Sequence, residues 1–196
     1  VYAAQHGMWF CPTHVVCKTL PDYVWNGKQL TEVEHFEDLP ECIRKRWEEE
    51  NEITCENYRK LGIKPDFQTI IDRGRTFLEY SDRVMAGTDC PYAGVVPGFA
   101  MADELESLVD AYGMTRYAAL AAATSRPAEY IGISDQKGKL LPGLDSDLIV
   151  LEENPLEAVG AVRKIRMVFQ GENVWDKEVL DGFLKAAGRL TQEEIE

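Results

Sequence analysis

A single acidic residue stands where a short apolar segment ends, in the sequence RVMAGTDCP at residues 83–91. Residues 84–86 have the apolar character of a buried strand, and Pro91 prevents the strand from continuing. Asp89 therefore comes at the carboxyl end of the predicted strand. In parallel α/β folds the functional side chains gather at this end of the sheet, which makes Asp89 the first candidate for a functional residue.

Hydrophobic spacing predicts that helices alternate with short strands. Helices are predicted at residues 43–61, 66–80 and 102–112, with Thr115 and Ser125 placed to cap two more. Strands are predicted at residues 7–16, 84–87 and 148–151, followed by two strands around a turn at Gly171. Because buried strands alternate with helices, the sequence predicts an α/β fold with a parallel sheet and a small β appendage.

Composition excludes several classes of partner. The formal net charge is −13, which argues against nucleic acid or an anionic membrane as a partner. No segment approaches the roughly 20 apolar residues needed to span a bilayer. The five cysteines have no CxxC spacing, which is typical of reduced thiols in a cytoplasmic protein. The first residue is Val rather than Met, so we expect truncation or processing.

Three stretches, taken in order, carry a resemblance to a known family. They are MAGTDCP at residues 85–91, AALAAATSRPAEYIGISDQKGKLLPGLDSDLIVLEENPL at 118–156, and IRMVFQGENVW at 165–175. Together they resemble the carboxyl-terminal part of the metal-dependent amidohydrolase superfamily, in particular its branch of imidazolonepropionase-like and prolidase-like enzymes. WFCPTHVV at residues 9–16 is similar to the seventh barrel strand of that branch. The resemblance covers roughly residues 1–19 and 81–175.

The resemblance implies an α/β fold made of a partial TIM (β/α)8 barrel and part of a small β-sandwich. Residues 1–132 would be the carboxyl-terminal part of the barrel, holding strands seven and eight with their helices and a lid-like insertion at about residues 20–62. Residues 133–176 would supply sandwich strands. Residues 177–196 would form a polar helical tail.

The insertion at residues 20–62 is rich in acidic residues, a pattern typical of a solvated helix face rather than a metal site. Loops that follow barrel strands cover the active site in this fold. We therefore expect part of the insertion to form a lid or pocket wall, with Tyr23, Trp25 and Phe36 as candidate substrate contacts. The alternative is an insertion that packs on a neighbouring subunit.

The resemblance also implies a chemistry for Asp89. In the family, the Asp that ends strand eight contacts the metal and takes the proton of the attacking water. A divalent metal lowers the pKa of bound water toward 7, and a nearby carboxylate can then act as general base and later as general acid. The expected metal is zinc, but the family's remaining ligands, which include a His-x-His pair, are absent from this chain. His14, directly after strand seven, and Tyr92, in the loop after strand eight, are the implied substrate-binding residues.

The sequence therefore predicts the carboxyl-terminal part of a metal-dependent amidohydrolase. It would hydrolyse C–N bonds of amides, ureas or cyclic imines through a metal-bound hydroxide, with Asp89 as metal contact and general acid/base. We expect this chain alone to be inactive. Two barrel strands leave unpaired edges, so the expected partners, besides a small-molecule substrate, are further copies of the chain or the N-terminal barrel portion. The alternative is a non-catalytic assembly module that oligomerises or completes a split barrel.

Overall fold

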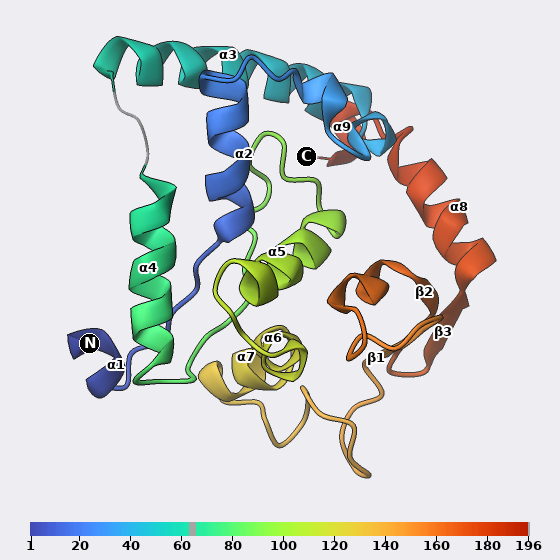
Figure 1. The fold of residues 1–196 in the computed structure, drawn as a ribbon. Helices are drawn as coiled ribbons and strands as arrows, with labels where there is room; N and C mark the ends of the chain where they lie inside the picture. The colour runs from blue at the N-terminus through green and yellow to red at the C-terminus, as the bar shows by residue number, and fades with distance from the viewer. Residues whose placement is uncertain (63–65, 196) are drawn as a thin grey trace.

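The computed structural model describes residues 1–62 and 66–195 and is mostly helical. Its α-helices are α1 (Tyr2–Gln5), α2 (His14–Val24), α3 (Glu41–Leu61), α4 (Phe67–Leu78), α5 (Phe99–Asp110), α6 (Arg116–Ala122), α7 (Ser125–Tyr130), α8 (Lys177–Ala187) and α9 (Gln192–Ile195). The strands are β1 (Leu148–Leu151), β2 (Ile165–Gln170) and β3 (Asn173–Asp176), and the 3-10 turns are η1 (Leu30–Glu32), η2 (Phe36–Asp38) and η3 (Val159–Arg163). Helix α3 crosses one end of the molecule, with α2 and α4 running away from it and α5 near the centre (Figure 1). Within the described part, no helix combines the length and the apolar character that a membrane span requires.

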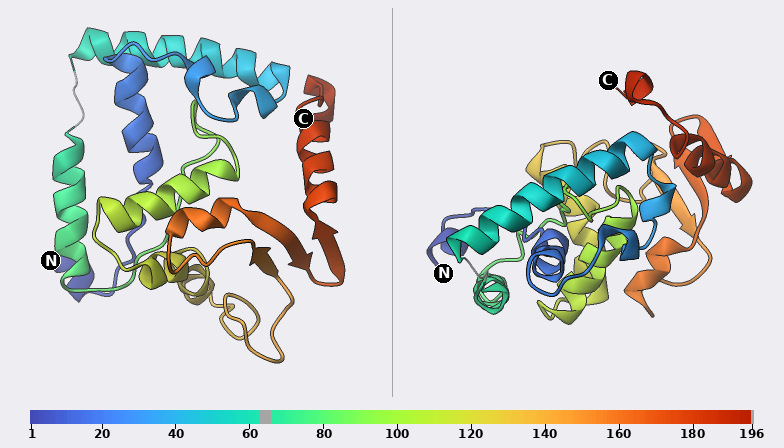
Figure 2. Two further views of the ribbon diagram at one scale, coloured as in Figure 1. Left: turned by 45° about the vertical axis from the view of Figure 1, so that its right-hand side comes forward. Right: turned by 90° about the horizontal axis from the view of Figure 1, so that it is seen from above.

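The predicted long amphipathic helix is confirmed as α3, which lies over the other helices when seen from above (Figure 2). Its inner face buries Trp47 and Cys55. The outer face carries ion pairs four residues apart, such as Glu56 with Lys60 at 2.8 Å, which support an exposed helix. Gly62 ends the helix in the left-handed conformation with φ of 63°, as the sequence indicates.

Among the described residues, two large apolar clusters and a smaller one of Val15, Val95 and Ala100 hold the helices together. The larger surrounds α5 and includes Leu105, Leu108 and Val84. The second lies between α2 and α3, where Phe36 is 2% exposed and Tyr23 is 3% exposed. The structure therefore corrects the expectation for Phe36, which is a core residue of the insertion and has no surface for a substrate.

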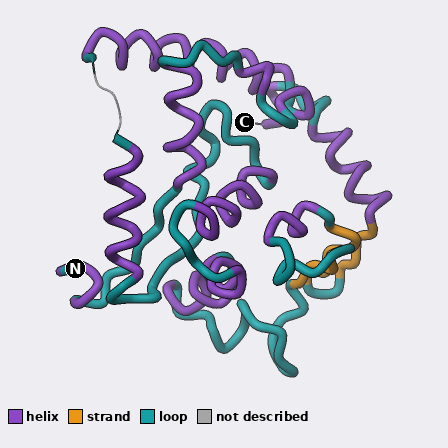
Figure 3. The backbone as a smooth tube through the Cα atoms, viewed as in Figure 1, coloured by secondary structure: helices purple, strands orange, loops and turns teal. Residues whose placement is uncertain are grey.

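The predicted parallel strands at residues 7–16 and 84–87 are wrong as regular strands. Only Phe10 and Val84 pair in parallel, through hydrogen bonds from Phe10 N to Arg83 O and from Met85 N to Phe10 O, both 2.9 Å. The chain between α1 and α2 and the chain between α4 and α5 are loops in Figure 3. The pairing ends after this one bridge, so the two segments form no continuous ladder of hydrogen bonds. The next donor, Ala86 N, turns away to Ala122 O at 2.9 Å.

The β appendage is confirmed as a three-stranded antiparallel sheet in the order β1-β2-β3. Strands β2 and β3 form the predicted hairpin, with Gln170 opposite Asn173 and Gly171 in the turn at φ of 59°. The segment η3 joins this sheet to α5. Its Arg163 forms ion pairs with Asp103 and Glu106 of α5, the latter at 2.7 Å.

The predicted caps are partly confirmed. The side chain of Thr115 accepts a hydrogen bond from Ala118 N at 3.1 Å and begins α6. Ser125 is not a cap, because Thr124 occupies the position before α7 and Ser125 is its first helical residue. The Thr124 hydroxyl instead donates to Leu120 O at 2.8 Å, which ties α7 to the end of α6.

Candidate active site

Asp89 lies exposed just beyond the segment that pairs with Phe10. Its φ of 56° puts it in the left-handed region, which Asp tolerates better than most residues. This backbone turn takes the chain out of the extended segment. The Asp89 carboxylate forms no hydrogen bond or ion pair with any described residue, so both of its oxygens remain available to another group.

Gly87 lets the Asp89 segment approach the neighbouring segment closely. A Cβ at this position would lie 2.5 Å from Cys11 Sγ and 3.6 Å from Thr13 Cγ2. A side chain at this position would therefore not fit without a shift of Cys11. The hydroxyl of the neighbouring Thr88 makes no hydrogen bond within residues 1–62 and 66–195.

The charges of Glu104 and Asp89 raise the pKa of the same two cysteine thiols. The pKa of Cys17 is raised, first by burial and then by the charges of Glu104 and Asp89. The same two charges contribute to the raised pKa of Cys11. These cysteines are poor thiolates and therefore poor nucleophiles. Across the described ranges, no group of three or more His, Cys, Asp or Glu side chains is arranged to hold a metal ion.

His14 begins α2 and is only 8% exposed. Its Nδ1 lies 3.4 Å from the hydroxyl of Tyr112, and the two rings meet edge-on at 5.4 Å. Burial lowers the pKa of the imidazole, with a smaller contribution from Lys18. The residue is therefore a neutral, well-packed histidine near neutral pH, and its role in substrate binding stays a prediction.

Tyr92 lies in the loop that follows Asp89, half-buried against the residues between α2 and α3. Burial is the main cause of its raised pKa, and the charge of Asp89 contributes. A neutral phenol near this carboxylate can donate or accept a hydrogen bond. The structure thus brings Tyr92 and Asp89 into the same region, whereas the ring of His14 packs on Tyr112.

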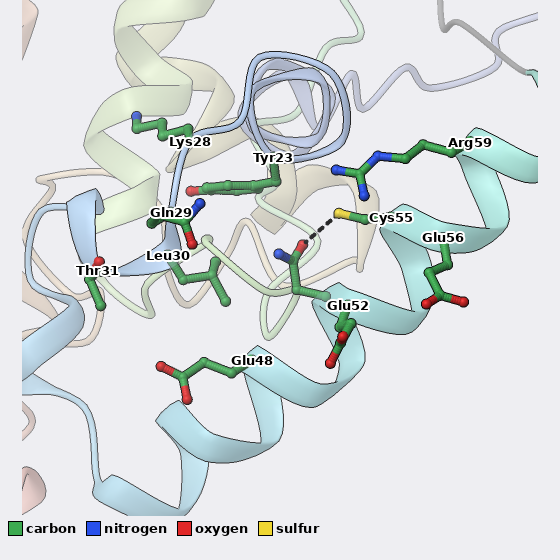
Figure 4. A pocket seen from close by; sticks show the side chains of 11 residues that line it. Tyr23, Lys28, Gln29, Leu30, Thr31, Glu48, Glu52, Cys55, Glu56 and Arg59 are labelled. Carbon is green, nitrogen blue, oxygen red and sulfur yellow. Dashed lines mark hydrogen bonds between the residues drawn. The ribbon is translucent and has the colours of Figure 1, made fainter.

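The structure contains a cavity of about 390 Å³ between α3 and the chain that follows α2 (Figure 4). In this view the side chains of Glu48 and Glu52 project from α3 on one side, and Tyr23 lies on the other. A second cavity of about 340 Å³ is also lined by Tyr23, together with Gly94 and other residues. Asp89 lines neither of these two cavities.

Glu104 is the functional candidate that sequence reasoning missed. Its side chain has 0% exposure, and burial raises its pKa to about 7, although hydrogen bonds from the backbone N–H groups of Val15 and His14 lower it. A signal was present, because Glu104 lies on the apolar face of α5 beside Leu105 and four residues before Leu108. A carboxylate in that position is rarely left buried without a specific reason.

Comparisons with known proteins agree with the resemblance. A family model described as "Amidohydrolase family" matches residues 3–177. "Amidohydrolase tasK" of Hapsidospora irregularis is 42% identical over 101 residues, which are 52% of this chain and 9% of that protein. The crystal structure of a Xaa-Pro dipeptidase with bound methionine in the active site aligns with a TM-score of 0.56 and 19% identity, over 88% of this chain and 35% of the dipeptidase. The latter likeness is one of fold, and the chain spans about a third of the dipeptidase.

Proposed function

The chain belongs to the amidohydrolase family, and on that premise we propose that it is the carboxyl-terminal part of a metal-dependent enzyme that hydrolyses C–N bonds. The bonds would be those of amides, ureas or cyclic imines. The observation that carries this proposal is the exposed, unpaired carboxylate of Asp89 at the end of the segment packed on Cys11 and Thr13.

We further propose how the chain is divided. Residues 1–132 would be the last part of a (β/α)8 barrel, with its seventh and eighth strands around Phe10 and Val84 and a lid-like insertion at about residues 20–62. Residues 133–176 would belong to a β-sandwich, and residues 177–196 would form a helical tail. The single parallel pair at Phe10 and Val84 supports the barrel assignment, because consecutive barrel strands run parallel.

In this proposal Asp89 moves the protons of the reaction. Its carboxylate accepts a proton from the attacking water and then gives that proton to the nitrogen that leaves. Because its oxygens have no partner among the described residues, no hydrogen bond within this part of the chain has to break first. Tyr92 would contact the substrate beside Asp89, and we keep His14 as a second, buried candidate.

The residues of this chain do not fit a complete metal site by themselves. Amidohydrolases in general depend on a divalent metal, which would supply the activation of water. The described residues offer only the Asp89 carboxylate at this position and no cluster of three ligand side chains. We therefore propose that Asp89 is one ligand, most simply to zinc, and that the others come from outside the chain.

The open segment edges support a partner. Met8 is 54% exposed, Cys11 is exposed, and residues 7–13 pair with the other extended segment through one residue only. An unpaired edge favours addition of further strands. The partner would be the N-terminal portion of the barrel or another copy of the chain. The same observation also favours the second candidate function, a non-catalytic module that assembles without hydrolysing anything.

The two functions are separated by measuring hydrolysis. The protein would be assayed with added zinc against a Xaa-Pro dipeptide, a cyclic urea and a cyclic imine, both as this chain and together with any N-terminal barrel portion. We expect turnover only in the assembled protein, and the Asp89→Asn change should reduce it at least about a thousandfold, as loss of a proton-transferring group does in catalytic sites. Asn also accepts the left-handed backbone at this position, so folding should be preserved.

The matched control is Asp135→Asn, an exposed Asp-to-Asn change in the connection before the sheet. It should leave turnover unchanged. Equal turnover in the Asp89 variant and the parent protein would remove Asp89 from the mechanism. Stable assembly without turnover of any substrate would favour the assembly module.

A further inference from the structure

The buried carboxylate of Glu104 caps the start of α2, a helix that has no local side-chain cap. Its Oε2 accepts a hydrogen bond from Val15 N at 2.8 Å, and the two residues are 89 positions apart in the sequence. Helix α2 begins at His14, and the preceding Thr13 gives no side-chain cap. Helices need acceptors for their first N–H groups, and a negative charge is stabilising there. Glu104 supplies both from α5.

Glu104 cannot itself touch a substrate in this arrangement. Its side chain has 0% exposure, and its second oxygen, Oε1, is buried with no hydrogen-bond partner among the described residues. A buried carboxylate oxygen without a hydrogen-bond partner lowers the stability of the fold. An apolar residue at this position of α5 would avoid the cost, so the charge must act through the backbone that it holds.

That backbone leads directly to the proposed catalytic segment. Thr13 adopts φ of 45°, so its turn into α2 is strained for a residue other than glycine. Thr13 and Cys11 are the side chains that face the missing Cβ of Gly87, two residues before Asp89. The hydrogen bond from Met85 N to Phe10 O joins the two segments further back. The start of α2 and the Asp89 turn are therefore packed as one unit.

We propose that Glu104 is a positioning residue for Asp89. By holding the N–H groups of the first turn of α2, it fixes residues 10–13, and these in turn fix the segment that presents the Asp89 carboxylate. The inference rests on the proposed function for its catalytic consequence. Its structural part, that the two segments depend on Glu104, stands independently of any reaction.

Hydrogen exchange at individual backbone amides tests the structural part. Variants Glu104→Ala and Glu104→Gln would be compared with Asp110→Asn, an exposed carboxylate-to-amide change at the end of the same helix. In the Ala variant, exchange at Val15 and at Met85 should be about tenfold or more faster, as loss of a bond to a charged acceptor predicts. The Gln variant keeps an acceptor oxygen and should stay within about threefold of the parent protein. The Asp110 variant should not differ.

Steady-state kinetics tests the catalytic part in the assembled protein. The Ala variant should lower kcat about tenfold or more with KM nearly unchanged, because a displaced proton-transfer group affects the transition state more than binding. The Gln variant should restore most of the loss. A merely structural role would instead lower the amount of folded protein and leave kcat per folded molecule intact.

The outcomes are separable. Faster exchange at Val15 with unchanged exchange at Met85 would refute the positioning path, and so would unchanged exchange at both. If the Ala variant does not fold, the Gln variant decides. Retained protection at both Val15 and Met85 supports the proposal, and loss of protection at Met85 while Val15 stays protected refutes it. If the parent protein hydrolyses nothing, the proposed function fails, while the exchange results still decide whether Glu104 fixes the Asp89 segment.

Discussion

Replacing Glu104 by Gln should change how the stability of the protein depends on pH. Glu104 is fully buried, and burial raises its pKa from 4.5 to about 7. Below pH 4.5 the carboxyl group is protonated in both the folded and the unfolded chain. As the pH rises, the unfolded chain releases this proton first, so the folded state loses stability until the folded group also ionises at about 7.

The size of the effect follows from that difference in proton affinity. At about 1.4 kcal/mol for each tenfold change, the free energy of unfolding should fall by roughly 3 kcal/mol across this interval. Gln does not titrate, so the Glu104→Gln protein should lack this loss. Its stability relative to the parent protein should therefore increase by about 2–3 kcal/mol between pH 5 and pH 8.

Urea unfolding followed by circular dichroism at several pH values measures the effect. The charge of Glu104 contributes to the raised pKa of Cys11, Cys17 and Tyr112, but burial is the first cause for each, so these groups keep their protons below pH 8 in both proteins. The pKa of His14 is lowered by burial and by Lys18, which are the same in both proteins. Asp110→Asn serves as the control and should give a profile parallel to that of the parent protein. Parallel profiles for the Glu104→Gln and parent proteins would refute the conclusion that burial raises the pKa of the Glu104 carboxyl.

Three further substitutions test the packing and the capping of the helices. Gly87→Ala places a Cβ 2.5 Å from Cys11 Sγ and should lower the free energy of unfolding by about 1–3 kcal/mol in urea unfolding. The control Gly182→Ala, within α8 and with open space around it, should raise the free energy of unfolding by up to about 1 kcal/mol. Equal effects of the two substitutions would contradict the close approach at Gly87. Trp47→Ala removes a side chain with 0% exposure and should lower the free energy of unfolding by about 3–5 kcal/mol. A decrease below about 1 kcal/mol would mean that Trp47 does not hold α3 against the other helices. Asp66→Ala removes the cap of α4 and should cost about 1 kcal/mol, measured by the same unfolding assay and contradicted by no change.

Local features of the fold were predictable because their causes are local. The cap at Thr115, the glycine stop at Gly62 and the turn at Gly171 each depend on a residue type and on a few neighbouring positions. The strands at residues 7–16 and 84–87 depend instead on partners on both sides. Apolar runs indicate the capacity to pair, but they do not supply the neighbouring strands that complete a parallel sheet.

The candidate site was predictable only in part. The run before Asp89 and the Pro after it identified the exposed carboxylate from sequence. The start of α2 at His14 was hidden, because its first turn is completed by Glu104 from a helix far along the chain. Capping rules consider only side chains close in sequence to a helix start, so they do not identify an acceptor 89 residues away.

The ion pairs of Arg163 affect which truncated forms of the protein keep α5 in place. Arg163 joins Asp103 and Glu106, which flank Glu104 on α5, and Val159 from the same segment packs into the cluster around Leu108. A protein shortened to residues 1–132 would leave these carboxylates without their counter-charge and expose apolar surface on α5. Such a truncation would loosen the helix on which the start of α2 depends, although it removes nothing that lies near Asp89 in the sequence.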